Sequence, residues 1–245
     1  MTVEDKTARL AGFLYLIVVV TGVFSLAYVP SRIPLSGDLA TAIESIRGSE
    51  SLFRFGIAAS IVLQVAFLLL PLALFKLLRH VNEAAATCMV ALAWVSVPLA
   101  LVALSSRLDA LSLVTDARYA AALAPQQLQA EVFVALGEHR NGNFLTMIFW
   151  GLWLLPLGWL VFRSGFLPKI LGIFLMLGCA GYLVNVFGQL LVAGYAESFV
   201  ARIAGKPASI GEIGLCLWLL FVGVRRPRSS AVQLSTAADA GNPRA

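Results

Sequence analysis

Six apolar stretches, each long enough for a membrane-spanning helix, constrain this chain more than any other feature of its sequence. A helix needs about 20 mostly apolar residues to cross the hydrocarbon core of a bilayer. The stretches that meet this requirement are Leu10–Val29, Phe55–Phe75, Ala84–Leu104, Phe144–Phe162, Ile170–Ala193 and Ala208–Val224. Prolines inside some of them are compatible with a span, because neighbouring helices can satisfy the freed backbone groups. The sequence therefore predicts an all-α, polytopic membrane bundle of about six transmembrane helices.

The composition of the chain excludes an ordinary soluble fold. Apolar residues make up 60% of the 245 residues and charged residues only 13%, whereas soluble domains carry about 25% charged residues. A soluble fold of this length could not bury so much apolar surface, but a bilayer can accommodate it. The three cysteines lie inside apolar stretches without CxxC spacing, which favours small core residues over a disulfide or a metal site.

The distribution of Lys and Arg between the loops predicts the orientation of the chain. One side of the bundle carries ten basic residues against four acidic ones, and the other side carries eight against nine. The ten are Lys6, Arg9, Lys76, Arg79, Arg163, Lys169, Arg225, Arg226, Arg228 and Arg244. We therefore expect both termini in the cytoplasm. A cleaved signal peptide is the alternative for the first stretch, but Glu4, Asp5 and the unbroken apolar run to Val29 favour an uncut anchor.

The chain is expected to form one transmembrane domain over residues 1–228, followed by a disordered cytoplasmic tail over residues 229–245. The tail is small and polar, so it cannot bury enough apolar surface to fold. The basic run Arg225-Arg226-Pro227-Arg228 is interpreted as a stop-transfer signal that contacts anionic lipids. The sequence therefore predicts membrane lipids, and no nucleic acid, as partners.

Two outer loops contain helical patterns. Residues 38–47 could form a short helix, and Glu50 and Arg54 after it stand in favourable i,i+4 order. A second pattern begins at Pro125, and its apolar residues recur every four positions, at Leu128, Val132 and Leu136. This stripe predicts an amphipathic helix that lies on the bilayer surface or across the helix ends. A loop helix that merely packs is the alternative.

Small residues at helical spacing mark two of the predicted spans. Gly181 and Gly188 lie on the same predicted helix as two amide side chains, Asn185 and Gln189. In the last span, small residues recur every three positions, at Ala208, Gly211 and Gly214. Small residues let helices in a membrane approach closely, and amides can then bridge them. Both sets are therefore predicted to serve helix packing.

Polar side chains inside the spans are the candidate functional residues, because such groups are costly to place in a bilayer. Gln64 lies near the middle of its span. The others fall in the outer half or at the outer end of theirs: Arg54, Arg107, Asp109, Asn143, Thr146, Asn185, Gln189 and Glu212. One hypothesis is an outward-facing polar pocket, with Arg54 and Arg107 as anion contacts and Glu212 as a counter-charge or proton carrier. The alternative is that these residues pair with one another and close the outer end of the bundle.

From this set the ligand-binding candidates are Arg54, Arg107, Asp109, Asn185, Gln189 and Glu212. No motif points to a catalytic, metal or cofactor site, because HExxH, CxxC, GxSxG and glycine-rich phosphate loops are absent from the sequence. His80 and His139 fall on opposite sides of the predicted membrane and cannot share a ligand. Trp150 and Trp153 share a helix face, which suits core or lipid packing. We therefore expect no catalytic residue, no metal and no cofactor.

Three segments of the chain carry a resemblance to a known family. They are Ala8-Arg9-Leu10-Ala11-Gly12, Glu50-Ser51-Leu52-Phe53-Arg54, and GLWLLPLGWLVFRSGFLPKILG over Gly151–Gly172. With these segments the chain resembles, over residues 8–226, the bacterial membrane family called domain of unknown function 4386. The resemblance implies a multi-helix protein of the bacterial cytoplasmic (inner) membrane, and it implies no activity.

Three classes of function remain open from the sequence. The favoured class is a membrane protein that binds or senses a small molecule or a lipid through the outward-facing polar pocket. A transporter or permease component would need a polar route through the inner half of the bundle, which the sequence does not contain. An enzyme that acts on a lipid would need a reactive pair, for which Glu212 with Arg107 or Arg54 is the only candidate.

Overall fold

The computed structural model describes residues 3–35 and 39–224. In that part of the chain every regular element is a helix, and six stretches are long and apolar enough to cross a membrane. These stretches are Glu4–Arg32, Glu50–Leu78, Glu83–Thr115, Pro125–Arg163, Lys169–Leu191 and Phe199–Val222. The predicted fold class, an all-α membrane bundle of six spans, is confirmed. The chain is a multi-pass membrane protein.

Three of the six spans consist of several consecutive elements. The first contains α1 (Val3–Gly22), the π-helix η1 (Val23–Tyr28) and α2 (Val29–Arg32), and the second and third are α4 (Glu50–Leu78) and α5 (Glu83–Thr115). The fourth span consists of α7 (Pro125–Leu152) and α8 (Leu154–Arg163), and the fifth is α9 (Lys169–Leu191). The sixth consists of α10 (Phe199–Ala204), α11 (Lys206–Leu217) and the π-helix η3 (Trp218–Val222). Short helices between spans are α3 (Leu39–Gly48), α6 (Ala117–Ala122) and the 3-10 helix η2 (Tyr195–Glu197).

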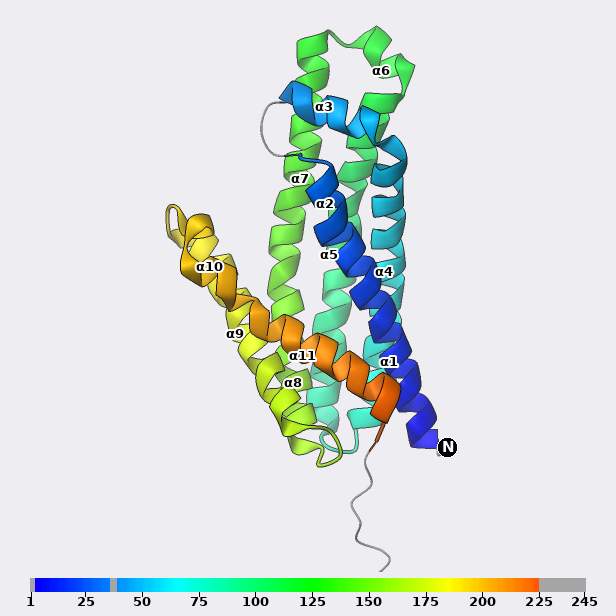
Figure 1. Ribbon diagram of the computed structural model, residues 1–245, viewed down its shortest axis with the longest axis vertical. Coiled ribbons are helices and arrows are strands. Elements are labelled where there is room, and N and C mark those ends of the chain that lie inside the picture. Colours follow the sequence, from blue (N-terminus) through cyan, green and yellow to red (C-terminus); the bar gives the residue numbers. More distant parts are fainter. Residues whose placement is uncertain (1–2, 36–38, 225–245) are drawn as a thin grey trace, which may run out of the picture.

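The long helices α4, α5 and α7 run along the long axis of the molecule, and α1 leans across them (Figure 1). Helices α9 and α11 pack against each other, and α11 crosses the bundle to reach α1. The start of α1, the α4–α5 and α8–α9 connections and the end of η3 lie at one end of the bundle, called here the terminal end (Figure 1). The opposite, distal end carries α3 and α6. Both ends of the described chain therefore lie on one side. The assignment of that side to the cytoplasm stays a prediction. The predicted tail 229–245 lies outside the described residues.

Helices α5 and α7 are too long for the bilayer alone. Helix α5 has 33 residues, which corresponds to about 50 Å, against a hydrocarbon core of about 30 Å. The segment after Pro125 was expected to be a separate helix on the bilayer surface, but it is the distal part of α7. Its apolar stripe, Leu128, Val132 and Leu136, is buried. The surface helix is therefore wrong, whereas the alternative of a helix that packs is observed, because the stripe is buried against α5.

The buried apolar side chains form two clusters. The main core lies between the six spans and includes Tyr15, Leu74, Trp153, Leu157 and Leu219. The distal core joins α2, α3 and the distal turns of α4, α5 and α7, and its members include Ile33, Ile46, Phe53, Leu111 and Val132. The short helix expected over residues 38–47 is observed as α3, and its Ile43 and Ile46 belong to this distal core.

Small residues allow the close packing of α9 and α11, as their spacing predicted. A Cβ atom on Gly178 would lie 2.7 Å from Cα of Ala208, and one on Gly211 would lie 2.9 Å from the backbone nitrogen of Leu175. Real Cβ atoms do not approach other atoms so closely, so each position requires glycine. This contact holds α11 across the bundle and so places the side chains that follow in the candidate site.

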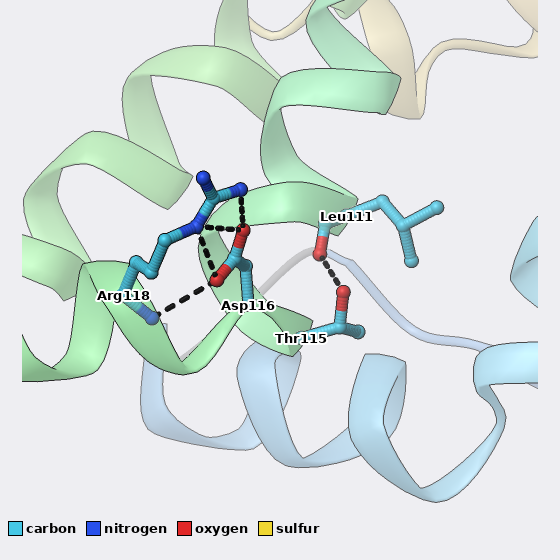
Figure 2. A network of polar contacts seen from close by, with 4 residues as sticks. All are labelled: Leu111, Thr115, Asp116 and Arg118. Atoms are coloured by element: carbon cyan, nitrogen blue, oxygen red, sulfur yellow. Dashed lines mark hydrogen bonds and ion pairs between the residues drawn. The ribbon is translucent and has the colours of Figure 1, made fainter.

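A polar turn closes the distal end of α5 (Figure 2). The Thr115 hydroxyl donates a hydrogen bond to the Leu111 carbonyl oxygen at 2.9 Å. Asp116 then accepts the backbone N–H of Arg118 at 2.9 Å and forms an ion pair with its guanidinium at 2.6 Å. The hydrogen bonds from Arg118 stabilise the charged carboxylate and lower the pKa of Asp116. The turn thus starts α6 with a satisfied N-cap.

Candidate ligand-binding site

The candidate site begins where the first and last spans cross near the terminal end. A Cβ atom on Gly12 would lie 2.6 Å from the backbone nitrogen of Leu220, so only glycine allows this approach. Arg9 Nη1 donates to the Leu220 carbonyl oxygen at 2.7 Å, and Cys216 Sγ lies 3.6 Å from the Gly12 carbonyl oxygen. These contacts fix the relative position of α1 and α11 for the next helical turn.

One turn further along both helices, the Tyr15 hydroxyl donates a hydrogen bond to Glu212 Oε1 at 3.1 Å. Tyr15 is buried in the main core, and Glu212 is partly buried. A carboxyl group inside a membrane bundle is costly to place, so such a residue marks a functional site by default when a specific partner holds it. Glu212 and Tyr15 form the polar centre of the candidate site.

A cavity of about 190 Å³ lies beside this pair and is called here the Glu212 cavity. Its walls come from α1, η1, α4, α7, α9 and α11, together with Trp153 between α7 and α8. The lining residues are Tyr15, Val18, Val19, Gly22, Val23, Leu26, Leu63, Phe67, Trp150, Trp153, Tyr182, Ser209, Glu212 and Ile213. Val23, Leu26 and Ile213 at its rim are exposed, so the cavity opens between α1 and α11 on the apolar side of the bundle.

The Glu212 cavity lies near the middle of the predicted bilayer. Tyr15, Phe67, Trp153 and Glu212 are each ten or eleven residues from the terminal end of their own span. At about 1.5 Å per residue these positions are about 15–17 Å from that end, against a half-thickness of about 15 Å for the hydrocarbon core. Four spans therefore place their lining residues at the same depth.

Aromatic side chains dominate the wall of the cavity. Phe67 and Trp153 pack edge-to-face with ring centroids 4.9 Å apart, and the Tyr15 and Trp153 centroids are 6.3 Å apart. Tyr182 reaches the cavity because α9 approaches α7 at Gly151, where a Cβ atom would lie 2.5 Å from Cβ of Tyr182. The motif around Gly151 thus positions the aromatic wall.

A second, much smaller cavity of about 20 Å³ continues from the first and shares Leu26, Leu63 and Trp150 with it. It is large enough for one water molecule. Ser25 Oγ and Gln64 Oε1 line it, are buried, and have no hydrogen-bond partner within the described residues. Ser25 is part of the π-helix η1, and such extra-residue turns occur often at functional sites.

The polar lining continues toward the distal end through His139 and Asn143. The His139 Nδ1–H donates to the Ala103 carbonyl oxygen at 2.8 Å, and this assigns the ring proton to Nδ1. Asn143 Nδ2 donates to His139 Nε2 at 3.0 Å. Polar groups thus extend from Glu212 to the distal half of the bundle, whereas the terminal half is filled by apolar side chains such as Leu74 and Leu157.

The six predicted ligand-binding residues do not form one cluster. Glu212 lines the Glu212 cavity, while Arg107 is buried in the distal region with its guanidinium 5.3 Å from the Phe53 ring centroid. Arg107 Nε has no hydrogen-bond partner within the described residues. Arg54 pairs with Glu50 at 2.7 Å on the surface, as the i,i+4 spacing predicted.

The remaining three candidates lie away from the Glu212 cavity. Asp109 and Gln189 are exposed. Asn185 Oδ1 accepts a hydrogen bond from the Tyr195 hydroxyl at 2.9 Å and so anchors η2 to α9. Thr146, also singled out by its depth, donates to the Gly142 carbonyl oxygen at 2.8 Å within α7. These contacts hold the helices and loops in place.

A larger cavity, about 550 Å³, lies at the terminal end and is lined by residues including Lys76, Arg79, His80 and Val224. Within the described residues no group of three or more His, Cys, Asp or Glu side chains could hold a metal ion.

Residues 10–223 match the protein family described as "Domain of unknown function (DUF4386)". The match covers most of the chain, and the chain belongs to this family. It is also 34% identical over 79 residues to an uncharacterized protein of Archaeoglobus fulgidus, a match that covers 32% of this chain and 44% of that protein. The chain thus spans less than half the length of that relative. No solved structure matches the chain.

Sequence reasoning found Glu212, Gln64 and Asn143 but missed the rest of the cavity lining. Trp150 and Trp153 were interpreted as packing residues, and Ser25 was not among the candidates, although all three line the cavities. Tyr15 was missed although its hydroxyl is the one polar side-chain group between Leu10 and Val20. A tyrosine hydroxyl inside a span needs a partner, and that requirement is the signal that points to Glu212.

Proposed function

We propose that this protein is a bacterial inner-membrane protein, with both termini in the cytoplasm, that binds a small molecule or a lipid group in the Glu212 cavity. The observation that carries the proposal is a cavity at mid-bilayer depth that is built from six helical elements around one hydrogen-bonded carboxyl group. Ligand sites are concave, mostly apolar and furnished with a few convergent polar groups. The cavity has this composition.

The lateral position of the opening supports uptake of the ligand from the bilayer. Exposed Val23, Leu26 and Ile213 surround it, and none of them would hold a polar solute. A ligand that enters between α1 and α11 has an apolar portion in contact with lipid. Binding that changes the spacing of these two helices would also move their crossing near Gly12. This movement gives the protein a means of sensing the ligand.

The cavity supports binding better than transport or catalysis. A transporter opens its site alternately to both sides, but fully buried Leu74, Leu157 and Leu219 fill the terminal half of the bundle. The reactive pair considered for an enzyme joins Glu212 to Arg107 or Arg54. Those arginines pack against Phe53 and pair with Glu50, away from the cavity lining.

Native mass spectrometry of the protein, extracted from its own membrane in a mild detergent, tests the proposal. Val19 lines the cavity, whereas the neighbouring Val20 is exposed on the outer face of α1. We expect a defined adduct on the wild type and on Val20→Trp, and its loss from Val19→Trp, in which the new side chain fills the cavity. A bare wild-type protein, or the same adduct on both variants, would show that the cavity does not hold a ligand.

A further inference from the structure

We propose that the ligand of the Glu212 cavity is an organic cation, an amine or quaternary ammonium group, whose apolar tail leaves the bundle between α1 and α11. This inference rests on the proposed function and names the chemical class of its ligand. Three observations lead to it: the charge of the lining, its aromatic composition, and the size and position of the opening.

The charge of the lining excludes an anion. Among the described lining residues there is one carboxyl group and no Lys, Arg or His. Tyr15 donates its hydrogen bond to Oε1 of Glu212, Oε2 has no hydrogen-bond partner within the described residues, and the carboxyl group lines the cavity. An accessible carboxylate oxygen in an apolar cavity attracts a positive charge, because an unpaired buried charge is costly and a paired one is not.

The aromatic lining provides the second means of holding a cation. Tyr15, Phe67, Trp150, Trp153 and Tyr182 all line the cavity. A cation near an aromatic face is attracted by the ring quadrupole, most strongly where water is excluded, and quaternary ammonium groups are commonly recognised in this way. Five aromatic side chains around one carboxyl group therefore suit an ammonium head group better than a neutral polar ligand.

The size of the cavity limits what it can enclose. At about 190 Å³ it is only somewhat larger than a cavity that holds one benzene molecule, and it is smaller than typical sites for drug-sized ligands. It can enclose an ammonium head group, and the apolar rim of Val23, Leu26 and Ile213 leaves the tail in contact with lipid. A phosphate in the same ligand would find no basic side chain in the lining.

Three probes with one hexyl chain separate charge from size: hexyltrimethylammonium, hexan-1-ol and hexyl sulfate. Binding to the purified full-length protein is followed by quenching of tryptophan fluorescence, because Trp150 and Trp153 line the cavity. The protein is kept in dodecyl maltoside micelles, whose head group is uncharged. The variants are Glu212→Gln, which keeps an oxygen acceptor for Tyr15, the exposed control Glu197→Gln, and Val19→Trp.

We expect hexyltrimethylammonium to bind the wild type and Glu197→Gln at least about tenfold more tightly than hexan-1-ol, with hexyl sulfate weakest. In Glu212→Gln the cation and the alcohol should bind with Kd values within about threefold of each other. If Glu212→Gln does not fold, Trp150→Leu replaces it in the same test. In this variant the Kd of the cation should rise at least about fivefold, while the Kd of the alcohol should stay nearly unchanged.

The outcomes distinguish failure of this inference from failure of the proposed function. Equal binding of cation and alcohol to the wild type, or a preference retained in Glu212→Gln, would overturn the cation while leaving a cavity that binds ligands. No binding of any probe to the wild type, or wild-type binding in Val19→Trp, would overturn both. Phosphatidylethanolamine added to the micelles identifies the source: displacement of the probe indicates a lipid head group, and lack of displacement indicates a free amine.

Discussion

The main core and the distal core contain the same kinds of side chain, but the main core is surrounded by lipid and the distal core by water. Around the main core, exposed residues such as Val62, Val65 and Leu99 are large and apolar, as lipid requires. Around the distal core, the exposed faces of α5 and α7 carry charged residues such as Asp109 and Glu131 beside apolar ones such as Leu108 and Phe133. The distal core is therefore held by the hydrophobic effect, whereas the main core depends on close packing, because lipid tails are as apolar as the core itself.

This difference explains where the glycines and the cavity occur. The close approaches of α9, α11 and α1 need Gly178, Gly211 and Gly12, all of which lie in the spans. In a bundle held by contact, a space such as the Glu212 cavity costs packing. A cavity kept at this cost is therefore expected to serve a function.

The largest effect is expected from Gly178→Leu in the α9–α11 contact. The side chain has no room beside Ala208, so the folded state should lose more than about 3 kcal/mol or fail to assemble. Gly137→Leu in the distal part of α7 is the control, because the nearest atom to its Cβ is 3.9 Å away. Thermal unfolding in detergent measures both, and similar losses would contradict the packing argument.

A second comparison uses two fully buried aliphatic residues, Ile46 in the distal core and Leu74 in the main core. Ile46→Ala should cost about 2–5 kcal/mol, because it loses both transfer from water and packing. Leu74→Ala should cost about half as much, since only packing is lost. Hydrogen exchange in α3 and in the last turns of α4, around Leu74, reports each region separately. A larger cost for Leu74→Ala would contradict the added hydrophobic contribution that is expected only in the distal core.

Arg107→Met tests whether the distal core contains a site of its own. Arg107 is 4% exposed and its Nε has no partner within the described residues, so an apolar side chain of similar length should raise stability by about 1 kcal/mol. The adduct detected by native mass spectrometry should remain unchanged. Loss of the adduct together with unchanged stability would move the ligand from the Glu212 cavity to Arg107.

The smallest effect is expected at the distal surface, where Arg118 lowers the pKa of Asp116 below its usual value of 3.8. A lowered carboxyl pKa adds stability above the unfolded value, and this contribution is lost as the pH falls through the folded pKa. Hydrogen exchange in α6 should therefore speed up below about pH 4. Asp116→Asn should remove this pH dependence while leaving α4 unchanged, and an identical acid response in the variant would assign it to another group.

The sequence was sufficient for the number and position of the spans, but it failed at their ends. Hydropathy ended the third span at Leu104 and began the fourth at Phe144, although α5 continues to Thr115 and α7 begins at Pro125. The reason is that hydropathy detects contact with lipid, and a helix can leave the bilayer and bury an amphipathic face against another helix. The surface pair Arg54–Glu50 was predicted because it is local to one turn.

The candidate site was likewise predicted only in part from the sequence. The sequence by itself determined that the protein is a six-span bundle, which small residues pack closely, and that Glu212 is an unusual charge inside a span. Only the tertiary structure decided that Tyr15, Phe67, Trp150 and Tyr182 surround that charge, while Arg107 lies in another core. Periodicity describes one helix at a time, whereas a cavity is formed by the crossing of several helices. Those crossings depend on contacts between residues far apart in the chain.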